Sequence, residues 1–426
     1  MSLIDDNWEK LFDSLNIEQE IHKNGLFYIT ADQIRVVKEP RLMTKFDTKE
    51  SLPGVFQNKY GILPVERGKY VIGEFELFHD FPESKTEITR ISSTRVEENF
   101  ETIDLNDIRS EAGAINIMNI SGILEDFLSE PSFYQTVSGR MGSGCFSFEI
   151  AAKDQRKRHD IEVKNSQIEI DAGFENKNVF AILEGKNVIH NNFLIRQLYY
   201  PLRLWREKIR KDIRPVFMVY SNQIFRLLEY RFLDHDLYNS IELVQEKNYS
   251  LEDIDISWKE LRDVFMKTVV RPEPDVTFIQ ADSFNKVISL AEHLDNAPLT
   301  SGEIAEVFGF RSRQSDYYFN ACKYLGLVSK RKDPQGNIRA YLTDMGRSLQ
   351  EMNYKERQLA YVGRILEHRV FYDLFETVLR MKELPDKKYI MYKMKEQQVC
   401  GDSLISRRAS SVQGWLRWMM QLVQMV

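Results

Sequence analysis

The stretch from Val179 to Lys186 reads VFAILEGK, and it decides the interpretation of this sequence. A run of apolar residues is followed directly by a carboxylate, a glycine and an ammonium group. Apolar residues on both sides of the chain are typical of a strand in the centre of a covered sheet. Because side chains alternate along a strand, Glu184 and Lys186 are expected to share one face, while Gly185 leaves room on the other.

Asp171 closes the strand-like segment that precedes this run. If the two strands are neighbours, Asp171, Glu184 and Lys186 converge at one edge of the sheet. Two carboxylates suit Mg²⁺, which takes oxygen ligands and keeps several waters. A nearby lysine adds positive charge for the transition state and can orient or deprotonate an attacking water. The pattern therefore predicts hydrolysis of a phosphodiester.

A second Glu-x-Lys motif, Glu162 and Lys164 after Asp160, competes with the first. Its lysine falls at the polar turn of a hairpin expected over residues 159–175, and its aspartate lies on the same short strand. We therefore favour the first motif. For either motif, a plain ion pair at a strand end is the structural alternative.

The motif Asp171…Glu184-Gly185-Lys186, on an apolar strand before a helix with Gln197-Leu198-Tyr199-Tyr200, resembles the PD-(D/E)xK nuclease superfamily. The resemblance implies that Asp171 and Glu184 bind Mg²⁺ and that Lys186 assists the attack of water. The overall layout is similar to that of type II restriction enzymes, a large branch of the superfamily. The proline that often precedes the aspartate is replaced by Ile170, and the Gln-x-x-x-Tyr helix of the recombination nucleases is not matched.

Composition is that of a soluble globular protein, with 43% hydrophobic and 29% charged residues. No apolar run approaches the roughly 18 residues that a membrane helix needs. The acidic start MSLIDDNWEK does not resemble a signal peptide, so we expect a cytoplasmic protein. Cys145, Cys322 and Cys400 are far apart and support neither a zinc site nor a disulfide framework.

The expected fold class is α/β (α+β) and multidomain. An N-terminal α+β domain, with a candidate role in DNA recognition, covers residues 1–125, and a nuclease core with a mixed sheet covers 126–280. A winged helix covers 284–350, and a helical C-terminal domain with a candidate second helix-turn-helix covers 351–426. The net charge is −6, but residues 281–426 hold 22 lysines and arginines against 17 acids, so the basic part is C-terminal.

The winged helix is predicted from the order of three helical patterns and a hairpin. The helices are FNKVISLAEHLDN, GEIAEVFG and RSRQSDYYFNACKYLGL, and the hairpin turns around residues 333–337. Such a module usually places its third helix in the major groove of DNA. Some winged helices instead serve as protein-interaction modules.

Candidate DNA contacts come from the basic loop 38–49, the glycine-rich segment 138–144, the helix after the central strand, the winged helix and the last helix. Arginine, lysine and glutamine there can hold phosphates or read base edges. The candidates are Lys38, Arg41, Lys45, Arg140, Arg196, Arg311, Arg313, Gln314, Lys330, Arg331, Arg407, Arg408 and Gln413.

Together these patterns predict a sequence-specific, Mg²⁺-dependent endonuclease for double-stranded DNA, of the type II restriction class. No nucleotide-binding motif is present, so no nucleotide cofactor is expected. Symmetric cutting of both strands needs two active sites, so a homodimer is expected. The alternatives are a non-catalytic winged-helix regulator, a structure-selective DNA repair nuclease and a protein-interaction scaffold.

Overall fold

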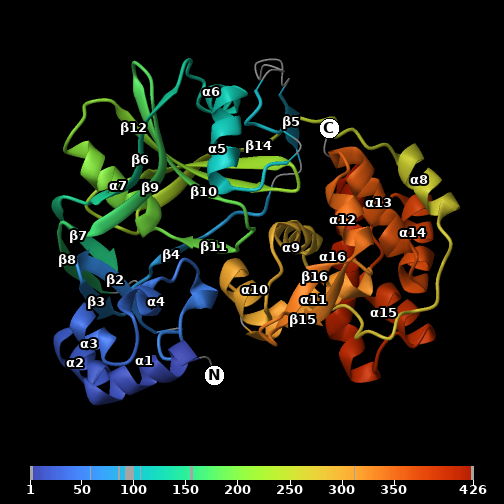
Figure 1. The fold of residues 1–426 in the computed structure, drawn as a ribbon, viewed down its shortest axis with the longest axis horizontal. Helices are drawn as coiled ribbons and strands as arrows, with labels where there is room; N and C mark the ends of the chain where they lie inside the picture. The colour runs from blue at the N-terminus through green and yellow to red at the C-terminus, as the bar shows by residue number, and fades with distance from the viewer. Residues whose placement is uncertain are drawn as a thin grey trace.

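The computed structural model describes residues 3–57, 59–84, 87–91, 100–105, 107–153, 157–310 and 312–423. The chain is a mixed α/β, multidomain protein with several sheets (Figure 1). A five-stranded and a seven-stranded sheet lie together, and a mainly helical part, residues 258–421, lies beside them. No helix in the described part of the chain is both long and apolar enough to cross a membrane.

The five-stranded sheet has the order β1-β3-β2-β8-β7 and combines strands from distant parts of the chain. The expected hairpin over residues 61–73 is present as β2 and β3. Helices α1–α4 pack into the same core, where the buried Trp8 donates its indole N–H to the Met43 carbonyl at 2.9 Å. The bounds are α1 Leu3–Ser14, α2 Ile17–Asn24, β1 Leu26–Thr30, α3 Ala31–Arg35, α4 Pro40–Thr44, β2 Gly61–Glu66, β3 Lys69–Gly73, β7 Cys145–Ala151 and β8 Arg158–Lys164.

The seven-stranded sheet has the order β5-β14-β13-β12-β10-β9-β6. Its central strand β10 pairs antiparallel with β9 and parallel with β12, so the sheet is mixed. Helix α7 connects the two parallel neighbours, as a crossover must. The bounds are β5 Ile88–Arg90, α5 Glu111–Ile120, α6 Ile123–Leu128, β6 Tyr134–Gly142, β9 Gln167–Glu175, β10 Val179–Lys186, α7 Arg196–Arg206, β12 Asp212–Ser221, β13 Ile224–Phe232 and β14 Ile241–Ser250.

The two faces of β10 belong to different cores. Phe180 and Ile182 pack toward α7 in the core that continues into the five-stranded sheet. Ala181 and Leu183 pack toward α5 and α6 in a separate core on the other face. This alternation of buried residues is what a central strand covered on both sides requires.

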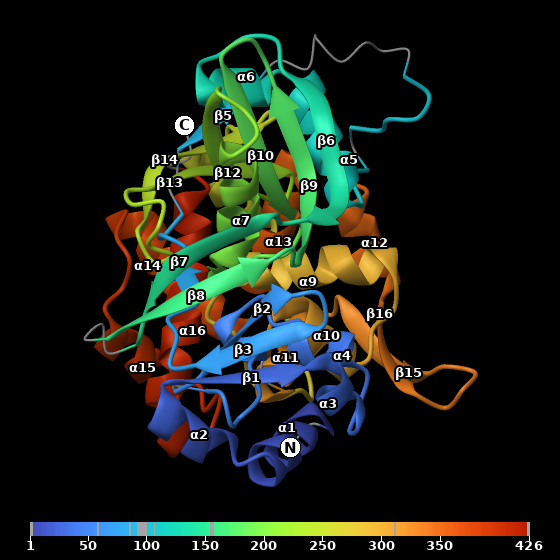
Figure 2. The same ribbon diagram turned by 90° about the vertical axis from the view of Figure 1, so that its left-hand side faces the viewer.

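One long bent ribbon joins the two sheets (Figure 2). β6 pairs with β9 in the seven-stranded sheet, and the same two chain segments continue as β7 and β8 in the five-stranded sheet. The register is unbroken across the bend, since Gly142 pairs with Gln167 and Cys145 with Lys164. Gly144 has a φ of +72° there, a conformation that glycine adopts without strain.

This ribbon corrects two expectations about the chain. Residues 159–175 do not form a hairpin with each other, because β8 and β9 run on as one strand of the ribbon. The boundary expected at residue 125 does not separate the sheets either: β5, α5 and α6 belong with the seven-stranded sheet, and β7 and β8 with the five-stranded one. Pairing between distant segments leaves no local signal in the sequence.

The helical part begins with the expected order of three helices and a hairpin. Helix α9 (Phe284–Asn296), α10 (Ser301–Phe308) and α11 (Ser312–Tyr324) are followed by β15 (Val328–Lys332) and β16 (Ile338–Leu342). Thr300 caps α10 through the Glu303 N–H. The remaining elements are β4 Phe78–Asp80, β11 Asn192–Leu194, α8 Trp258–Lys267, α12 Asp344–Gln350, α13 Tyr354–Leu366, α14 Arg369–Met381, α15 Lys387–Glu396, α16 Asp402–Gln421 and the 3-10 turn Lys49–Ser51.

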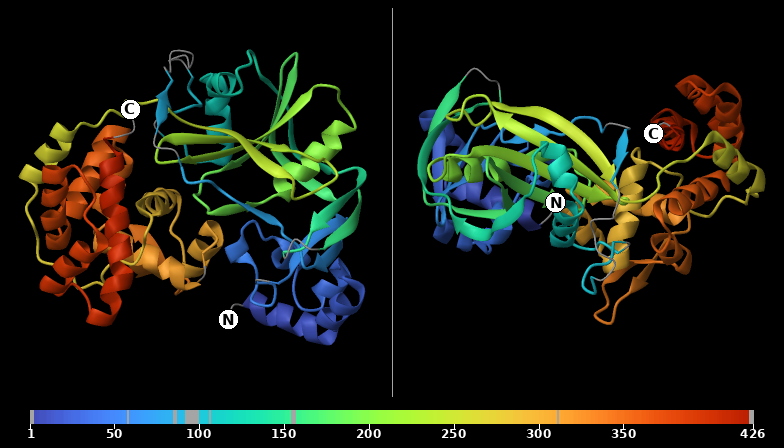
Figure 3. Two further views of the ribbon diagram at one scale, coloured as in Figure 1. Left: turned by 180° about the vertical axis from the view of Figure 1, so that it is seen from behind. Right: turned by 90° about the horizontal axis from the view of Figure 1, so that it is seen from above.

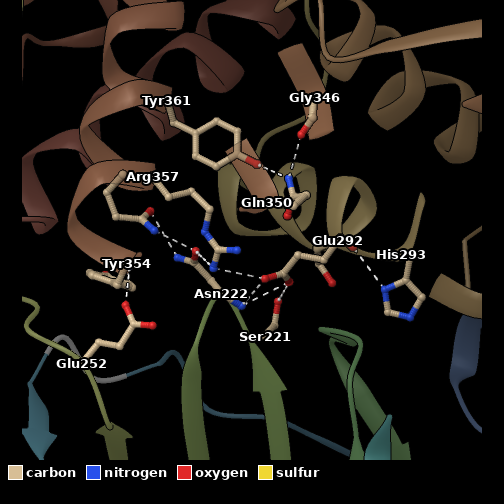
Figure 4. A network of polar contacts seen from close by, with 12 residues as sticks. Ser221, Asn222, Glu252, Glu292, His293, Gly346, Gln350, Tyr354, Arg357 and Tyr361 are labelled. Carbon is tan, nitrogen blue, oxygen red and sulfur yellow. Dashed lines mark hydrogen bonds and ion pairs between the residues drawn. The ribbon is translucent and has the colours of Figure 1, made fainter. Parts of the chain in front are cut away.

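A buried polar network fastens the helical part to the seven-stranded sheet (Figure 4). The turn after β12 inserts between α9 and α13, where the Asn222 N–H donates to Glu292 at 2.9 Å. The Asn222 side chain exchanges two hydrogen bonds with Gln358 and accepts one from Arg357 at 3.2 Å. From behind, the helical part lies beside the sheets, and its first helices, α9 and α10, are nearest to them (Figure 3). The turn after β12 therefore attaches the helical part directly to the seven-stranded sheet.

Candidate functional site

The end of β10 carries the candidate carboxylate and lysine in the expected orientation. Glu184 and Lys186 follow Phe180 and Ile182 on the face toward α7. On the other face, a Cβ on Gly185 would lie 3.1 Å from Ile115 of α5, so a larger residue would press on that helix. The parallel neighbour β12 places Val219 beside Lys186.

Asp171 lies inside β9, not at its end as expected, and a β-bulge sets its direction. Between the pairs Val137–Gly173 and Gly139–Ile170, β9 advances three residues where β6 advances two. The extra residue falls where Asp171 and Ala172 stand, and bulges commonly re-aim side chains in this way. Asp171 Oδ2 accepts a 2.8 Å hydrogen bond from the Gly185 N–H, which brings it to the Glu-Gly-Lys motif.

Glu184 is the centre of the polar contacts. Its Oε1 accepts hydrogen bonds from Lys186 Nζ at 2.6 Å and from the side-chain amide of Gln197. Lys186 also donates to the Gly185 carbonyl at 3.1 Å. Gln197 stands on α7, so the helix that follows the strand supports the carboxylate, a role the sequence did not reveal.

Burial dominates the electrostatics of this cluster. It raises the pKa of the Glu184 carboxyl to about 7, and the nearby Asp171 adds to the effect while Lys186 opposes it. Burial alone would lower the pKa of Lys186, but Glu184, Glu111 and Asp171 together raise it above its ordinary value. The lysine therefore keeps its proton and acts as a fixed positive charge.

Glu111 is a third carboxylate of the cluster, and sequence reasoning missed it. It is the first residue of α5, and the Asn187 backbone N–H donates to it. Burial raises its pKa, with Asp171 adding to the shift and Lys186 opposing it. In the sequence, Ser110-Glu111 at the start of a helical pattern indicates only a helix N-terminus, so nothing there pointed to a site.

The cluster lies in a groove of about 680 Å³ between the two sheets. α3, α4 and β2 supply one wall, and β6, β9 and α7 supply the other. Among the described residues its charged lining is balanced: Arg35, Arg41, Lys45, Arg67, Arg140, Lys186 and Arg196 face Glu39, Asp47, Glu66, Glu111, Glu169, Asp171 and Glu184. When Asp171 and Glu184, the candidate metal ligands, are set aside, seven basic residues remain against five acidic ones.

The competing Glu-x-Lys motif is an exposed ion pair. Lys164 Nζ lies 2.9 Å from Glu162, and both side chains are more than half exposed. The pair stands on β8 in the five-stranded sheet and does not line the groove. The geometry thus favours the cluster at Asp171, Glu184 and Lys186.

The structure brings four of the five predicted N-terminal and central DNA contacts to this groove. Arg41, Lys45, Arg140 and Arg196 line it, whereas Lys38 lies outside it on the segment after α3. Two of the four are ion-paired: Lys45 with Asp47 at 3.9 Å and Arg140 with Glu169 at 3.3 Å.

The predicted contacts in the helical part form a second set. Arg313 on α11 and Arg407 on α16 both flank the Tyr317 ring, with guanidinium carbons 5.9 and 5.7 Å from its centroid. Lys330 and Arg331 are exposed on β15, and Gln314 is half-buried on α11. Arg311 lies outside the described residues.

Two residues of α16 do not lie where we expected. Arg408 is buried, because it stands three residues after Ile405 and four before Val412, within the apolar stripe of the helix. Gln413 is half-buried and donates to the Pro385 carbonyl at 3.4 Å. Neither belongs to the exposed face of the last helix.

Asp171 and Glu184 each leave one carboxylate oxygen open to a Mg²⁺ ion, although they do not form a complete metal site by themselves. Within the described residues, no group of three or more histidine, cysteine, aspartate or glutamate side chains is arranged to hold a metal ion. Asp171 uses Oδ2 and Glu184 uses Oε1 in hydrogen bonds to the protein, which leaves Oδ1 and Oε2 for a cation. Because Mg²⁺ keeps most of its waters, two carboxylate oxygens suffice.

Three family models match the chain, and each is described as a domain of unknown function. They are Domain of unknown function (DUF6996) at residues 5–72, (DUF6997) at residues 73–250 and (DUF7226) at residues 286–424. The carboxylate cluster lies wholly within the second match. No curated protein and no solved structure matches the chain.

Proposed function

We propose that this chain is a Mg²⁺-dependent endonuclease that hydrolyses phosphodiester bonds of double-stranded DNA at a specific sequence, as type II restriction enzymes do. One observation carries the proposal: Asp171, Glu184 and Lys186 meet at the end of the central strand, inside a groove with arginines on both walls. A negatively charged, extended substrate suits such a groove.

Each member of the cluster has a definite part in this proposal. Asp171 and Glu184 would hold Mg²⁺, which when bound supplies Lewis acidity and a water of lowered pKa. Lys186 keeps its proton, so it would orient the attacking water and stabilise charge on the phosphate. Gln197 fixes Glu184 in place, and Glu111 holds the segment after Lys186 through the Asn187 N–H.

The helical part supports the DNA-binding half of the proposal. Residues 284–350 have the element order of a winged helix, with basic residues on β15 and an arginine near the start of α11. These residues would supply sequence recognition, and a homodimer would supply the second active site needed to cut both strands.

The deciding experiment is incubation of purified protein with unmethylated plasmid and phage DNA in Mg²⁺, followed by sequencing of all ends. Controls are EDTA, Lys186→Ala and the matched variant Lys164→Ala, which removes the lysine of the exposed Glu-x-Lys pair. The expected result is discrete fragments that share one short motif, lost with EDTA and Lys186→Ala but kept with Lys164→Ala.

The other outcomes identify the rival functions. Intact DNA with sequence-specific retention in a gel shift would replace the nuclease by a non-catalytic regulator. Cleavage at junctions or flaps without a shared motif would indicate a structure-selective repair nuclease. Intact DNA with no retention would leave a protein-interaction role.

A further inference from the structure

Arg196 differs from the other cations of the groove because, among the described residues, it is both half-buried and without a carboxylate partner. Among the described residues, Arg35, Lys45 and Arg140 each form an ion pair with a carboxylate. No described carboxylate lies within ion-pair distance of Arg41, Arg67 or Arg196, and of these three only Arg196 is half-buried. A partly buried charge without a counter-charge is costly, so a ligand is expected to supply one.

The Arg196 side chain is held in place although it is unpaired. Its guanidinium lies over the ring of the fully buried Tyr200, 5.6 Å from the centroid, and the Tyr200 hydroxyl donates to the Pro64 carbonyl at 3.1 Å. Its Nε is covered and makes no hydrogen bond. An arginine fixed by stacking presents its donors with little further loss of conformational entropy.

Two other residues that line the same groove carry buried polar atoms without a partner. Ser166 at the bend of the ribbon is fully buried, and its Oγ has no hydrogen-bond partner. The Oε1 of Gln197, next to Arg196 on α7, also lacks one, while its Nε2 donates to Glu184. Both atoms are enclosed in the wall of the groove, so they make the surroundings of Arg196 polar.

We propose that Arg196 binds the phosphate on which the Asp171–Glu184–Lys186 cluster acts and stabilises charge on its non-bridging oxygens. This inference rests on the proposed function. A guanidinium offers paired N–H donors that match phosphate geometry, and such donors stabilise most where charge develops. Arg196 is then a catalytic residue, and its loss lowers the rate of cleavage more than the affinity for DNA.

The test compares Arg196→Met with Arg206→Met, which removes an exposed arginine of the same helix outside the groove. Single-turnover cleavage should fall about 100-fold or more in Arg196→Met, with little change in the Kd for duplex measured without Mg²⁺. Arg196→Lys should recover part of the rate, and Arg206→Met should match the wild type. Equal losses of rate and affinity in Arg196→Met, or no loss, would overturn the proposal.

A second measurement separates this inference from the nuclease proposal. Thermal unfolding of the wild type, Arg196→Met and Arg206→Met is followed in orthophosphate and in sodium chloride of equal ionic strength. Stabilisation by orthophosphate that is lost only in Arg196→Met supports the phosphate subsite even if the wild type cuts no DNA. Absence of phosphate stabilisation in the wild type would reject the subsite, whatever the nuclease assay shows.

Discussion

Asp171 Oδ2 accepts a 2.8 Å hydrogen bond from the backbone N–H of Gly185, the residue between Glu184 and Lys186. The aspartate therefore has two separable properties: it ties two strands together through an acceptor oxygen, and it carries a negative charge. An amide keeps the first property and removes the second.

Asp171→Asn should fold normally and lose activity. The asparagine oxygen can still accept from Gly185, so the thermal midpoint should stay close to that of the wild type. Without the charge, Mg²⁺ affinity falls and cleavage should slow by roughly 100-fold or more. Cleavage assays and thermal unfolding on the same preparation check this. A variant that cuts DNA at the wild-type rate would remove Asp171 from the site.

The buried Glu184 predicts that the metal-free protein loses stability as pH rises. Its pKa is raised from 4.5 to about 7 by burial, so the native state holds a proton that the unfolded state releases. The stabilisation is complete below pH 4.5 and is lost as pH rises through 7, by on the order of 3 kcal/mol. Denaturant unfolding from pH 5 to 8 should show this decline, and Glu184→Gln should flatten it.

Mg²⁺ should reverse that decline. In the proposed site the cation would bind the ionised carboxylates and compete with the proton, so it should stabilise the native state most above pH 7. Ca²⁺ or Mg²⁺ titrations at pH 6 and 8 provide the measurement. If the cation stabilises the native state equally at pH 6 and pH 8, it does not bind at Glu184.

Asn222→Gly should weaken the attachment of the helical part. Asn222 has a φ of +54°, which glycine tolerates, so the change removes only the side chain and leaves Arg357 and Gln358 without its hydrogen bonds. A loss of about 2–4 kcal/mol is expected in denaturant unfolding. Asn165→Gly is the matched control, because Asn165 has a φ of +53° and is exposed. Equal effects of the two changes would show that the network contributes little.

Arg313 and Arg407 should act as one DNA contact. Both flank Tyr317, although they stand on different helices, so each single change to alanine should weaken duplex binding and lower its salt dependence. The double variant should lose less than the sum of the two free-energy changes, as neighbouring residues commonly do. Fluorescence anisotropy at several salt concentrations measures this, with exposed Lys388→Ala as the control. If the free-energy changes of the two single variants add exactly in the double variant, Arg313 and Arg407 contact DNA independently.

The elements predicted best were those with local signals. The apolar run of β10, the helices α9 and α10 and the hairpin of residues 61–73 all lie where the sequence places them. The Glu184–Lys186 pair was predictable for the same reason, since alternation along one strand puts both on one face.

The rest depended on contacts between distant segments. Glu111 reaches the cluster only because α5 covers the seven-stranded sheet, and Gln197 only because α7 crosses back over β10. The bulge at Asp171 and the continuation of the ribbon into a second sheet follow from pairing, which single-sequence periodicity does not report. The burial of Arg408 could have been predicted from its helical spacing to Ile405 and Val412. We expected it on the exposed face only because it is charged.

The ribbon that joins the two sheets is also expected to limit movement between the two walls of the groove. Its two walls share one hydrophobic core, and only Ser143 and Gly144 separate β6 from β7 at the bend. Because continuous strands and one core join the two walls, we expect the groove not to close around a bound molecule. For a duplex held in this groove, the cost of any misfit would fall on the DNA. Sequences with flexible pyrimidine–purine steps would then be accepted more readily than stiff ones, before a single base edge is read.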